Sequence, residues 1–281
     1  MRTIVMKFGG ASVDSPESFL HIADIIAARR KSYSNVVVVV SAMGDTTNQL
    51  LSLARKVHPD PPKREEDMLV SAGERMSSAL LAMALKRKGF DALSFTGSQV
   101  GIVTSAKHAD ARILDVRPFR LFAPLRQGKV VIVAGFQGVG LDGGITTLGR
   151  GGSDTTAVAL AAALQAQKVE FFKDVKGVFS TDPKMDPSAK FHEHLSYEEA
   201  RAIVQKGSCI LHERAIDLAA KAGICLRVLS YKQSVDSDEG TTIGFSSIDH
   251  EELPNPSFSK TKGQGYEALF QQEVKEVFSG V

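Results

Sequence analysis

The stretch VVVVVSAM, residues 36–43, decides the fold class of this chain. Its five consecutive valines leave no polar face, so the strand that they form must be covered on both sides. A strand buried on both faces is typical of the centre of a parallel sheet that has helices packed above and below it. In both directions from this stretch, short β-branched segments alternate with helical patterns along the 281-residue chain.

The alternation extends over most of the chain. Further strands are predicted at TIVMKF (3–8), DALSF (91–95), VVIVAGF (130–136), VEFFKDV (169–175) and LRVLSY (226–231). Helices are predicted from Pro16 after a Ser15 cap, over about 66–88, over 195–207 ending at Gly207, and over 212–223 ending at Gly223. The sequence therefore predicts an α/β fold, a three-layer αβα sandwich with a mainly parallel central sheet.

The bulk composition indicates a soluble cytoplasmic protein. A net charge of +2 gives no reason to expect nucleic acid or a membrane as partner, and no apolar run is long enough to cross a bilayer. Cys209 and Cys225 are too few for a disulfide framework and are predicted to be buried thiols. The histidines show no metal-ligand spacing, and His192 and His194 are interpreted as solvated loop residues. The run KREED, residues 63–67, is interpreted as the solvated start of a helix.

One domain is expected over residues 1–245. After about residue 245 the chain becomes polar and rich in turn residues, which predicts a linker. YEALFQQEVKEVF, residues 266–278, has the pattern of one amphipathic helix, which would dock on the domain or on a second subunit.

GVGLDG, residues 138–143, matches the glycine pattern of a dinucleotide-binding loop. That function would require a helix to open at the third glycine. GITTLGRGG follows instead, which favours a hairpin or an extended loop. The phosphate loop G-x-x-x-x-G-K-[ST] is absent from the sequence.

Two other glycine-containing stretches are better candidates for an anion site. KFGGAS, residues 7–12, places Lys7 at the end of the first strand and turns the chain at Gly9 and Gly10. Backbone N–H groups there could hold phosphate oxygens, at the edge of the sheet where open α/β proteins bind ligands. The alternative is a tight turn with a solvated lysine.

TLGRGGSDTTAVALAAAL, residues 147–164, places Arg150 and two glycines directly before a helix. Ser153 or Asp154 could cap that helix, and the bare corner suits an anion that comes close to the backbone. For Asp154 the alternative is a first-turn carboxylate stabilised by the helix dipole.

Six stretches, in this order, resemble the catalytic domain of the aspartokinases, which belong to the amino-acid kinase superfamily. They are KFGGAS, VVVSAMGDTTNQL (38–50), SAGERMSSALL (71–81), AGFQG (134–138), TLGRGGSDTTAVALAAAL and KDVKGVFSTDP (173–183). The resemblance covers about residues 1–245. It implies ATP-dependent phosphorylation of the side-chain carboxylate of L-aspartate to 4-phospho-L-aspartate, with Mg²⁺, in a homodimer. That reaction is the first step in making lysine, threonine and methionine.

The resemblance also assigns residues to the amino-acid substrate in the N-terminal half. Arg150, with Gly151, Gly152 and Ser153, would hold a carboxylate of the substrate. Glu74 would pair with its α-ammonium group, and Thr47 would lie nearby. For Glu74 the alternative is a helix-surface carboxylate next to Arg75.

The nucleotide is expected on the C-terminal half, from about residue 165. An ionised carboxylate needs no general base, so catalysis should rest on positive charge. Lys7 would stabilise the transferring phosphoryl group, and Asp154 would orient Lys7 or hold a magnesium-bound water. The expected nucleotide contacts are Lys7, Phe8, Gly9, Gly10, Ser41, Lys173, Asp174, Phe179 and Lys184, with no protein metal ligands.

The chain departs from the family pattern at several of these positions. Many relatives have threonine at position 173, tyrosine at 179 and arginine at 184, and Cys209 stands where a phosphate-facing lysine is common. The departure at Cys209 puts nucleotide affinity in question. The chain also ends before the regulatory domains usual in the family, so no inhibition by lysine or threonine within this polypeptide is expected. A kinase of another acid and a non-catalytic nucleotide-binding protein remain the alternatives.

Overall fold

The computed structural model describes residues 2–181, 186, 188–208 and 210–244. The predicted linker and helix over 246–281, together with Lys184 and Cys209, lie outside these residues.

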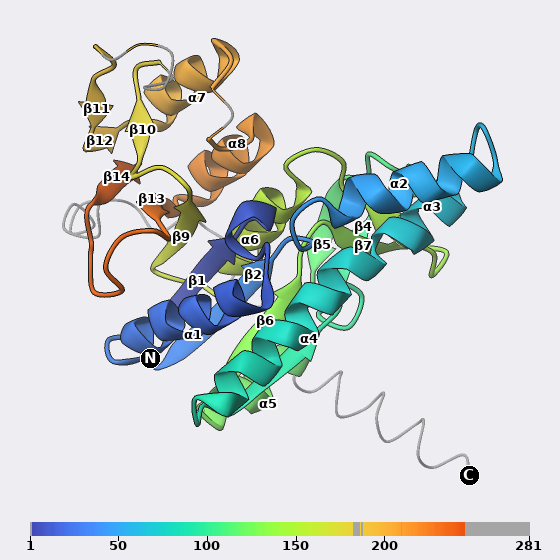
Figure 1. Cartoon of the computed structure of the whole chain (residues 1–281), viewed down its shortest axis with the longest axis horizontal. Helices are drawn as coiled ribbons and strands as arrows, with labels where there is room; N and C mark the ends of the chain where they lie inside the picture. The colour runs from blue at the N-terminus through green and yellow to red at the C-terminus, as the bar shows by residue number, and fades with distance from the viewer. Residues whose placement is uncertain (1, 182–185, 187, 209, 245–281) are drawn as a thin grey trace. The chain divides into compact units, whose positions relative to one another are not determined.

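An eight-stranded sheet forms the centre of the described part of the chain (Figure 1). Its strands in spatial order are β12 (His194–Leu195), β14 (Gly240–Ile243), β13 (Cys225–Ser230), β9 (Lys168–Lys173), β1 (Thr3–Phe8), β2 (Asn35–Val40), β6 (Val130–Ala134) and β3 (Ala92–Phe95). Within it, β13 and β14 pair antiparallel and the other neighbours pair parallel. The valine strand β2 lies between β1 and β6, and all five of its valines are fully buried. The prediction of a central parallel strand is confirmed.

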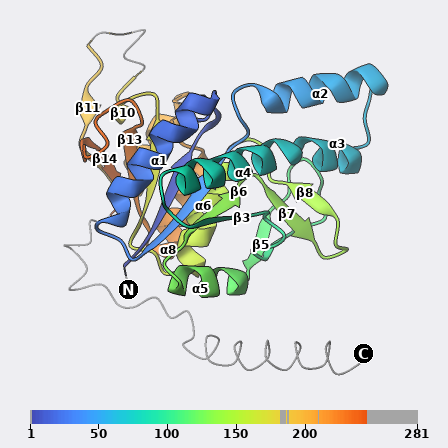
Figure 2. The same ribbon diagram turned by 60° about the horizontal axis from the view of Figure 1, so that its bottom comes forward.

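Helices cover both faces of this sheet, which confirms the three-layer arrangement (Figure 2). On one face lie α1 (Pro16–Arg30) and α4 (Ala72–Arg87). On the other lie α5 (Phe119–Arg126), α6 (Gly152–Ala163) and α8 (Glu213–Ala222), with α7 (Tyr197–Gln205) packed on α8. Alternate residues of β1 and β2 point into the two cores, because successive side chains of a strand face opposite sides.

The predicted helix boundaries hold where a cap residue marks them. The Ser15 side chain accepts a hydrogen bond from the Ser18 N–H, and Pro16 is the first residue of α1. Gly223 ends α8 in the left-handed conformation, with φ of 64°. Gly207, with φ of 107°, follows the end of α7.

The single helix predicted over about 66–88 is wrong. The structure has α3 (Lys63–Val70) and α4, with Ser71 between them. The Ser71 carbonyl accepts a hydrogen bond at 2.9 Å from the Gln137 side chain, so a distant residue binds the chain at the point where the helix breaks. Asp67 is also not solvated, because it is 1% exposed within α3.

A second sheet contains β5 (Ile113–Val116), β4 (Ile102–Thr104), β7 (Gln137–Gly140) and β8 (Ile145–Thr147). Strands β7 and β8 form an antiparallel hairpin, so the glycine pattern at 138–143 opens no helix and the hairpin prediction is confirmed. The remaining elements are η1 (Gly10–Ser12), α2 (Thr46–Val57), β10 (Val178–Phe179) and β11 (Phe191–His192). His192 and His194 lie in β11 and β12, not in a loop as expected, because their backbones pair with Val178 and Thr242.

Candidate active site

A cavity of about 290 Å³ lies at the carboxyl edge of β1 and β2. It is lined by Lys7, Gly10, Ser41, Ala42, Gly44, Thr47, Glu74, Phe136, Gly149, Arg150, Gly151, Gly152, Ser153 and Asp154. Segments far apart in the sequence therefore meet in one place, because parallel strands end at the same edge of the sheet.

A buried ionic cluster lies beside this cavity, and two of its members, Lys7 and Asp154, line it. Lys7, at the end of β1, places its Nζ 2.6 Å from Oδ1 of Asp154, in the first turn of α6. Lys173, at the end of β9, places its Nζ 3.5 Å from the other oxygen of Asp154. Lys7 is 6% exposed and Asp154 5%, so little water screens the pair.

The pKa values of Asp154 and Lys173 are shifted within this cluster. Burial by itself would raise the pKa of Asp154, but the positive charges of Lys7 and Lys173 outweigh burial and lower it. Burial lowers the pKa of Lys173 to about 8, with the neighbouring Lys7 acting in the same direction and the attraction of Asp154 opposing both. The cluster therefore has more positive than negative charge, which suits an anionic ligand.

The corner that carries Arg150 is built from glycines in the left-handed region. Gly149 has φ of 70° and Gly151 has φ of 72°, so Arg150 lies between two positions at which other amino acids would be strained. Gly151 is the N-cap of α6 and no side chain caps this helix. The predicted cap by Ser153 or Asp154 is thus wrong: both lie inside the first turn, and the Asp154 carboxylate binds the two lysines instead.

Glu74 lies in the first turn of α4 and is 3% exposed. Its Oε1 accepts a hydrogen bond from the Ala42 N–H at 3.2 Å, whereas its buried Oε2 has no hydrogen-bond partner among the described residues. Burial raises the pKa of Glu74 to about 7, against the opposing effect of backbone hydrogen bonds. The alternative of a helix-surface carboxylate next to Arg75 is wrong, since Glu74 is buried and Arg75 donates instead to the Ser71 hydroxyl. An orphaned acceptor in a cavity is typical of a ligand site.

Several residues predicted to contact the nucleotide do not line this cavity. The Phe8 ring is fully buried and stacks on Phe172, with ring centroids 4.6 Å apart. Phe179 packs against Phe191, with centroids 5.4 Å apart. Gly9, Lys173 and Asp174 also lie outside the lining, although a Cβ added at Gly9 would come within 3.6 Å of the Lys7 Nζ.

Four residues that line the cavity were not predicted from the sequence: Ala42, Gly44, Phe136 and Gly149. Phe136 has φ of 69°, an uncommon conformation for a bulky residue. Its carbonyl accepts from the Leu148 N–H and its N–H donates to the Thr156 hydroxyl, so that the backbone is fixed on both sides. The only signal in the sequence was its position in AGFQG, one of the stretches that carry the family resemblance.

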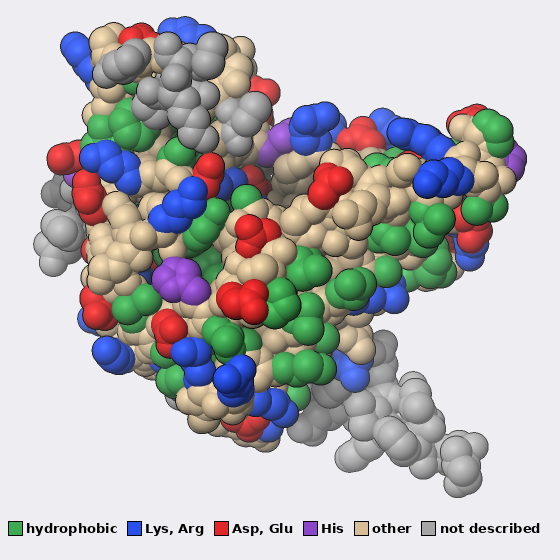
Figure 3. Space-filling view, viewed as in Figure 1, with side chains coloured by type: hydrophobic (Ala, Val, Ile, Leu, Met, Phe, Trp, Pro, Cys, Tyr) green, Lys and Arg blue, Asp and Glu red, His purple; other side chains and the backbone are tan. Residues whose placement is uncertain are grey.

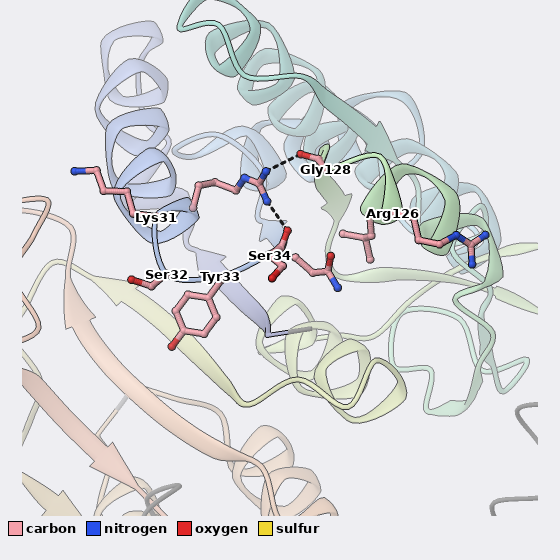
Figure 4. Close-up of a pocket in the computed structure, with 9 residues that line it drawn as sticks. Lys31, Ser32, Tyr33, Ser34, Arg126 and Gly128 are labelled. Carbon is pink, nitrogen blue, oxygen red and sulfur yellow. Dashed lines mark hydrogen bonds between the residues drawn. The ribbon is translucent and has the colours of Figure 1, made fainter.

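A second cavity, of about 380 Å³, lies between the end of α1 and the end of α5 (Figure 4). Arg30 spans it and donates to the carbonyls of Ser34 and Gly128. The side chains of Lys31 and Arg126 point away from each other in Figure 4, so the cations of this cavity do not converge on a ligand.

Among the described residues, no three His, Cys, Asp or Glu side chains gather to hold a metal ion. No helix in the same part of the chain is both long and apolar enough to cross a membrane.

A parallel sheet between helices, with a cationic, glycine-lined cavity at its carboxyl edge, defines a class of α/β proteins that bind anionic ligands at that edge. The particular family follows from sequence: the model of the amino acid kinase family matches residues 2–230, and the chain belongs to this family.

Within the family, the chain is similar to the aspartokinases. It is 49% identical to an aspartokinase of Bacillus sp. strain MGA3 over 243 residues, which are 86% of this chain and 58% of that protein. Aspartate kinase from Synechocystis superposes with a TM-score of 0.77 at 43% identity, over 89% of this chain and 41% of that one. Aspartokinase III of E. coli, in complex with aspartate and ADP, also superposes with a TM-score of 0.77, at 27% identity over 88% of this chain and 65% of that one. The chain spans about three fifths of the length of the curated relatives that it matches.

Proposed function

We propose that this chain transfers the γ-phosphoryl group of ATP to the side-chain carboxylate of L-aspartate, which gives 4-phospho-L-aspartate and ADP, the first step of aspartate-family amino-acid biosynthesis. One observation carries the proposal: a single cavity contains the Lys7–Asp154 pair, Arg150 on its glycine corner, and the orphaned carboxylate oxygen of Glu74. The E. coli relative, which binds aspartate and ADP, supports it.

The amino-acid substrate is recognised at both of its backbone groups. Arg150 binds the α-carboxylate with parallel hydrogen bonds, and the Gly151–Ser153 backbone and the Ser153 hydroxyl supply further donors. The unpartnered Oε2 of Glu74 accepts from the α-ammonium, and Thr47, which also lines the cavity, lies within the same site. An N-acylated amino acid lacks that ammonium group, so Glu74 favours a free amino acid.

In the reaction, an oxygen of the aspartate side chain forms a bond to the γ-phosphorus, and the bond from this phosphorus to the β,γ-bridging oxygen breaks. The attacking carboxylate is already ionised, since its pKa is about 3.9, and no base is required. The barrier is the approach of two anions. Lys7 lowers it by stabilising charge on the transferring group, Asp154 holds Lys7 in place, and Lys173 adds a second positive charge.

We assign the nucleotide to the C-terminal half, from about residue 165. Backbone N–H groups at Gly9 and Gly10, with the Ser41 hydroxyl, contact phosphate oxygens. The remaining proposed contacts are the backbone of Phe8, and Lys173, Asp174, Phe179 and Lys184. Because the Phe179 ring packs on Phe191, its contribution is an apolar surface for the adenine.

Magnesium would accompany the nucleotide and neutralise part of its phosphate charge. Asp154, the carboxylate beside Lys7, is already bound by two ammonium groups, and no acidic cluster lies among the described residues. The fit is therefore to an ion held mainly by phosphate oxygens and water, which is a common way for proteins to bind Mg²⁺.

We also propose a homodimer, formed through an apolar stripe on the amino-acid half. Met76, Leu80 and Met83 of α4 are 48%, 36% and 64% exposed, and Met68 of α3 continues the stripe at 44% (Figure 3). Methionine on an exposed helix face is typical of contact surfaces. Light scattering should give twice the chain mass, and Met83→Lys should lower the measured mass to that of the monomer. A monomer at working concentration would refute the dimer.

An assay of ADP release over a panel of acids, with hydroxylamine to trap acyl phosphates, tests the activity. We expect hydroxamate from L-aspartate and none from N-acetyl-L-aspartate or L-glutamate, with Lys7→Met as the inactive control. Hydroxamate from another acid alone would identify a different kinase of the family. ADP binding without turnover on any acid would identify a non-catalytic nucleotide-binding protein.

A further inference from the structure

The first turn of α8 contacts the corner that carries Arg150. Arg214, one residue into this helix, donates from Nη1 to the Leu148 carbonyl at 3.2 Å and from Nη2 to Oδ1 of Asp110 at 2.6 Å. Leu148 lies two residues before Arg150. A guanidinium presents several donors in one plane, so Arg214 can bind both acceptors in a fixed geometry.

The residue that caps α8 contacts the other flank of Arg150. A Cβ placed on Gly151 would lie 2.2 Å from the Cβ of His212, so the His212 side chain packs directly against the Gly151 backbone. Residues on both sides of Arg150 are therefore held by one short segment, 212–214. The Arg150 side chain is exposed, so its direction depends on the backbone that carries it.

Asp110 is firmly held on its other side. Its Oδ2 accepts from Lys107 at 2.7 Å, and the hydrogen bonds from Lys107 and Arg214 lower the pKa of Asp110 to about 2. The preceding residue, Ala109, donates its N–H to the buried carboxylate of Asp67. Asp110 thus anchors Arg214 to a loop that is itself bound to α3, and the pair remains charged at neutral pH.

We propose that Arg214 is a positioning residue for substrate binding: by binding Leu148 and Asp110, it fixes the backbone from which Arg150 reaches the amino-acid substrate. The inference rests on the proposed function only in naming L-aspartate as that substrate. It also means that α8, from the C-terminal half to which we assign the nucleotide, supports the amino-acid site of the other half.

The test is steady-state kinetics of Arg214→Gln, with the full chain. Arg201→Gln is the matched control. Arg201 of α7 pairs with Asp217 of α8, so this substitution removes an ion pair from the same helix at a residue that does not contact the Arg150 corner. Since small misplacements of a substrate-binding group have large kinetic effects, we expect KM for L-aspartate to rise about tenfold or more and KM for ATP to change less than about twofold. Arg214→Lys should raise KM for L-aspartate by an intermediate amount, because an ammonium group keeps the charge but not the planar set of donors.

Amide hydrogen exchange of the same variants gives a readout that needs no turnover. Arg214→Gln and, independently, Asp110→Asn should speed exchange over residues 147–154, and Arg201→Gln should not. Equal changes in both KM values, an unchanged KM for L-aspartate, or unchanged exchange at 147–154 would overturn the inference. If the unmodified chain forms no aspartyl phosphate but Arg214→Gln still speeds that exchange, the proposed function fails while the role of Arg214 in fixing the corner stands.

Discussion

Strand β9 has a buried ionic cluster at each end, and the two clusters differ in what surrounds them. At its amino end, the fully buried Glu170 lies 2.7 Å from the Arg29 Nε and 2.8 Å from the Lys168 Nζ. At its carboxyl end, Lys173 and Lys7 flank Asp154. Both clusters place one carboxylate between two cations, so their compositions do not tell them apart.

The pKa of the strand lysine and access to a cavity separate the two clusters. At the amino end, Asp238 lies near Arg29 and also pairs with Arg227, and attraction to Glu170 outweighs burial and raises the pKa of Lys168. At the carboxyl end, burial and the neighbouring Lys7 lower the pKa of Lys173, and Lys7 and Asp154 line a cavity. A cluster away from the site cavity supports the fold, whereas one whose members line that cavity can receive an anion.

The largest expected effect is on stability, from Glu170→Gln. This change leaves Arg29 and Lys168 largely buried with reduced compensation, and loss of one member of a buried ionic cluster costs about 3–5 kcal/mol. Urea unfolding should show the lower free energy of unfolding, with kcat per folded molecule unchanged. If the variant unfolds like the original protein, or is folded but inactive, the proposed difference in role between the two ends of β9 is refuted.

Lys7→Met should act on the reaction instead. Asp154 keeps Lys173 as a partner, so the fold should survive, but the charge that stabilises the transferring group is lost. Removal of one such group typically lowers kcat about 10²–10³-fold. Arg29→Met is the matched control and should destabilise the fold without lowering kcat of the folded fraction. Retention of normal kcat in Lys7→Met would show that the cluster beside the cavity is structural too.

Glu74→Gln tests the orphaned acceptor. A charged hydrogen bond contributes about 1.5–3 kcal/mol, so KM for L-aspartate should rise about ten- to hundredfold. Glu65→Gln, on the exposed face of α3, is the control and should have no effect.

The pH dependence of Glu74 has a defined sign. Its pKa is raised by burial from 4.5 to about 7, so the ligand-free protein binds an extra proton between these values and loses stability as the pH rises through this window. The charged form that binds the α-ammonium dominates above pH 7, so KM for L-aspartate should fall as the pH rises from 6 to 8. Melting curves and KM values of Glu74→Gln that retain the same pH dependence would refute this assignment.

The smallest expected effect concerns Lys173. Burial, with the charge of Lys7, lowers its pKa to about 8, so its positive charge is lost as the pH rises through that value. The ratio kcat/KM for ATP reports groups of the free enzyme and should decline above pH 8, by less than about tenfold because Lys7 remains. In Lys173→Met, kcat/KM for ATP should be lower at pH 7 and should not change with pH over this range. A decline that persists in the variant would have to come from another group.

Much of the fold could be predicted because it depends on local pattern. The five valines of β2 predicted helical layers on both faces of the sheet, and the Ser15–Pro16 pair predicted the start of α1. The missed break at Ser71 has a non-local cause, since the Gln137 amide that binds its carbonyl comes from a strand 66 residues away.

In the candidate site, too, some features could be predicted from local pattern and others depend on contacts between distant segments. Lys7 and Arg150 could be predicted to meet, because a strand end and a glycine corner before a helix both lie at the carboxyl edge of a parallel sheet. The burial of Glu74 could not, since its helix shows no local sign of the Ala42 N–H that approaches it. The contact of Arg214 with Leu148 likewise joins two segments whose spacing carries no signal.

The sequence by itself determined the alternation of strands and helices, the order of the layers and the chemical types gathered at one edge of the sheet. It did so because hydrophobic periodicity and glycine conformation are properties of neighbouring residues. Only the tertiary structure decided which carboxylates are paired, which oxygen is left without a partner and which cations face open space. Those properties depend on burial and on distances of a few ångströms between groups far apart in the chain, and burial sets the free energy of every charge.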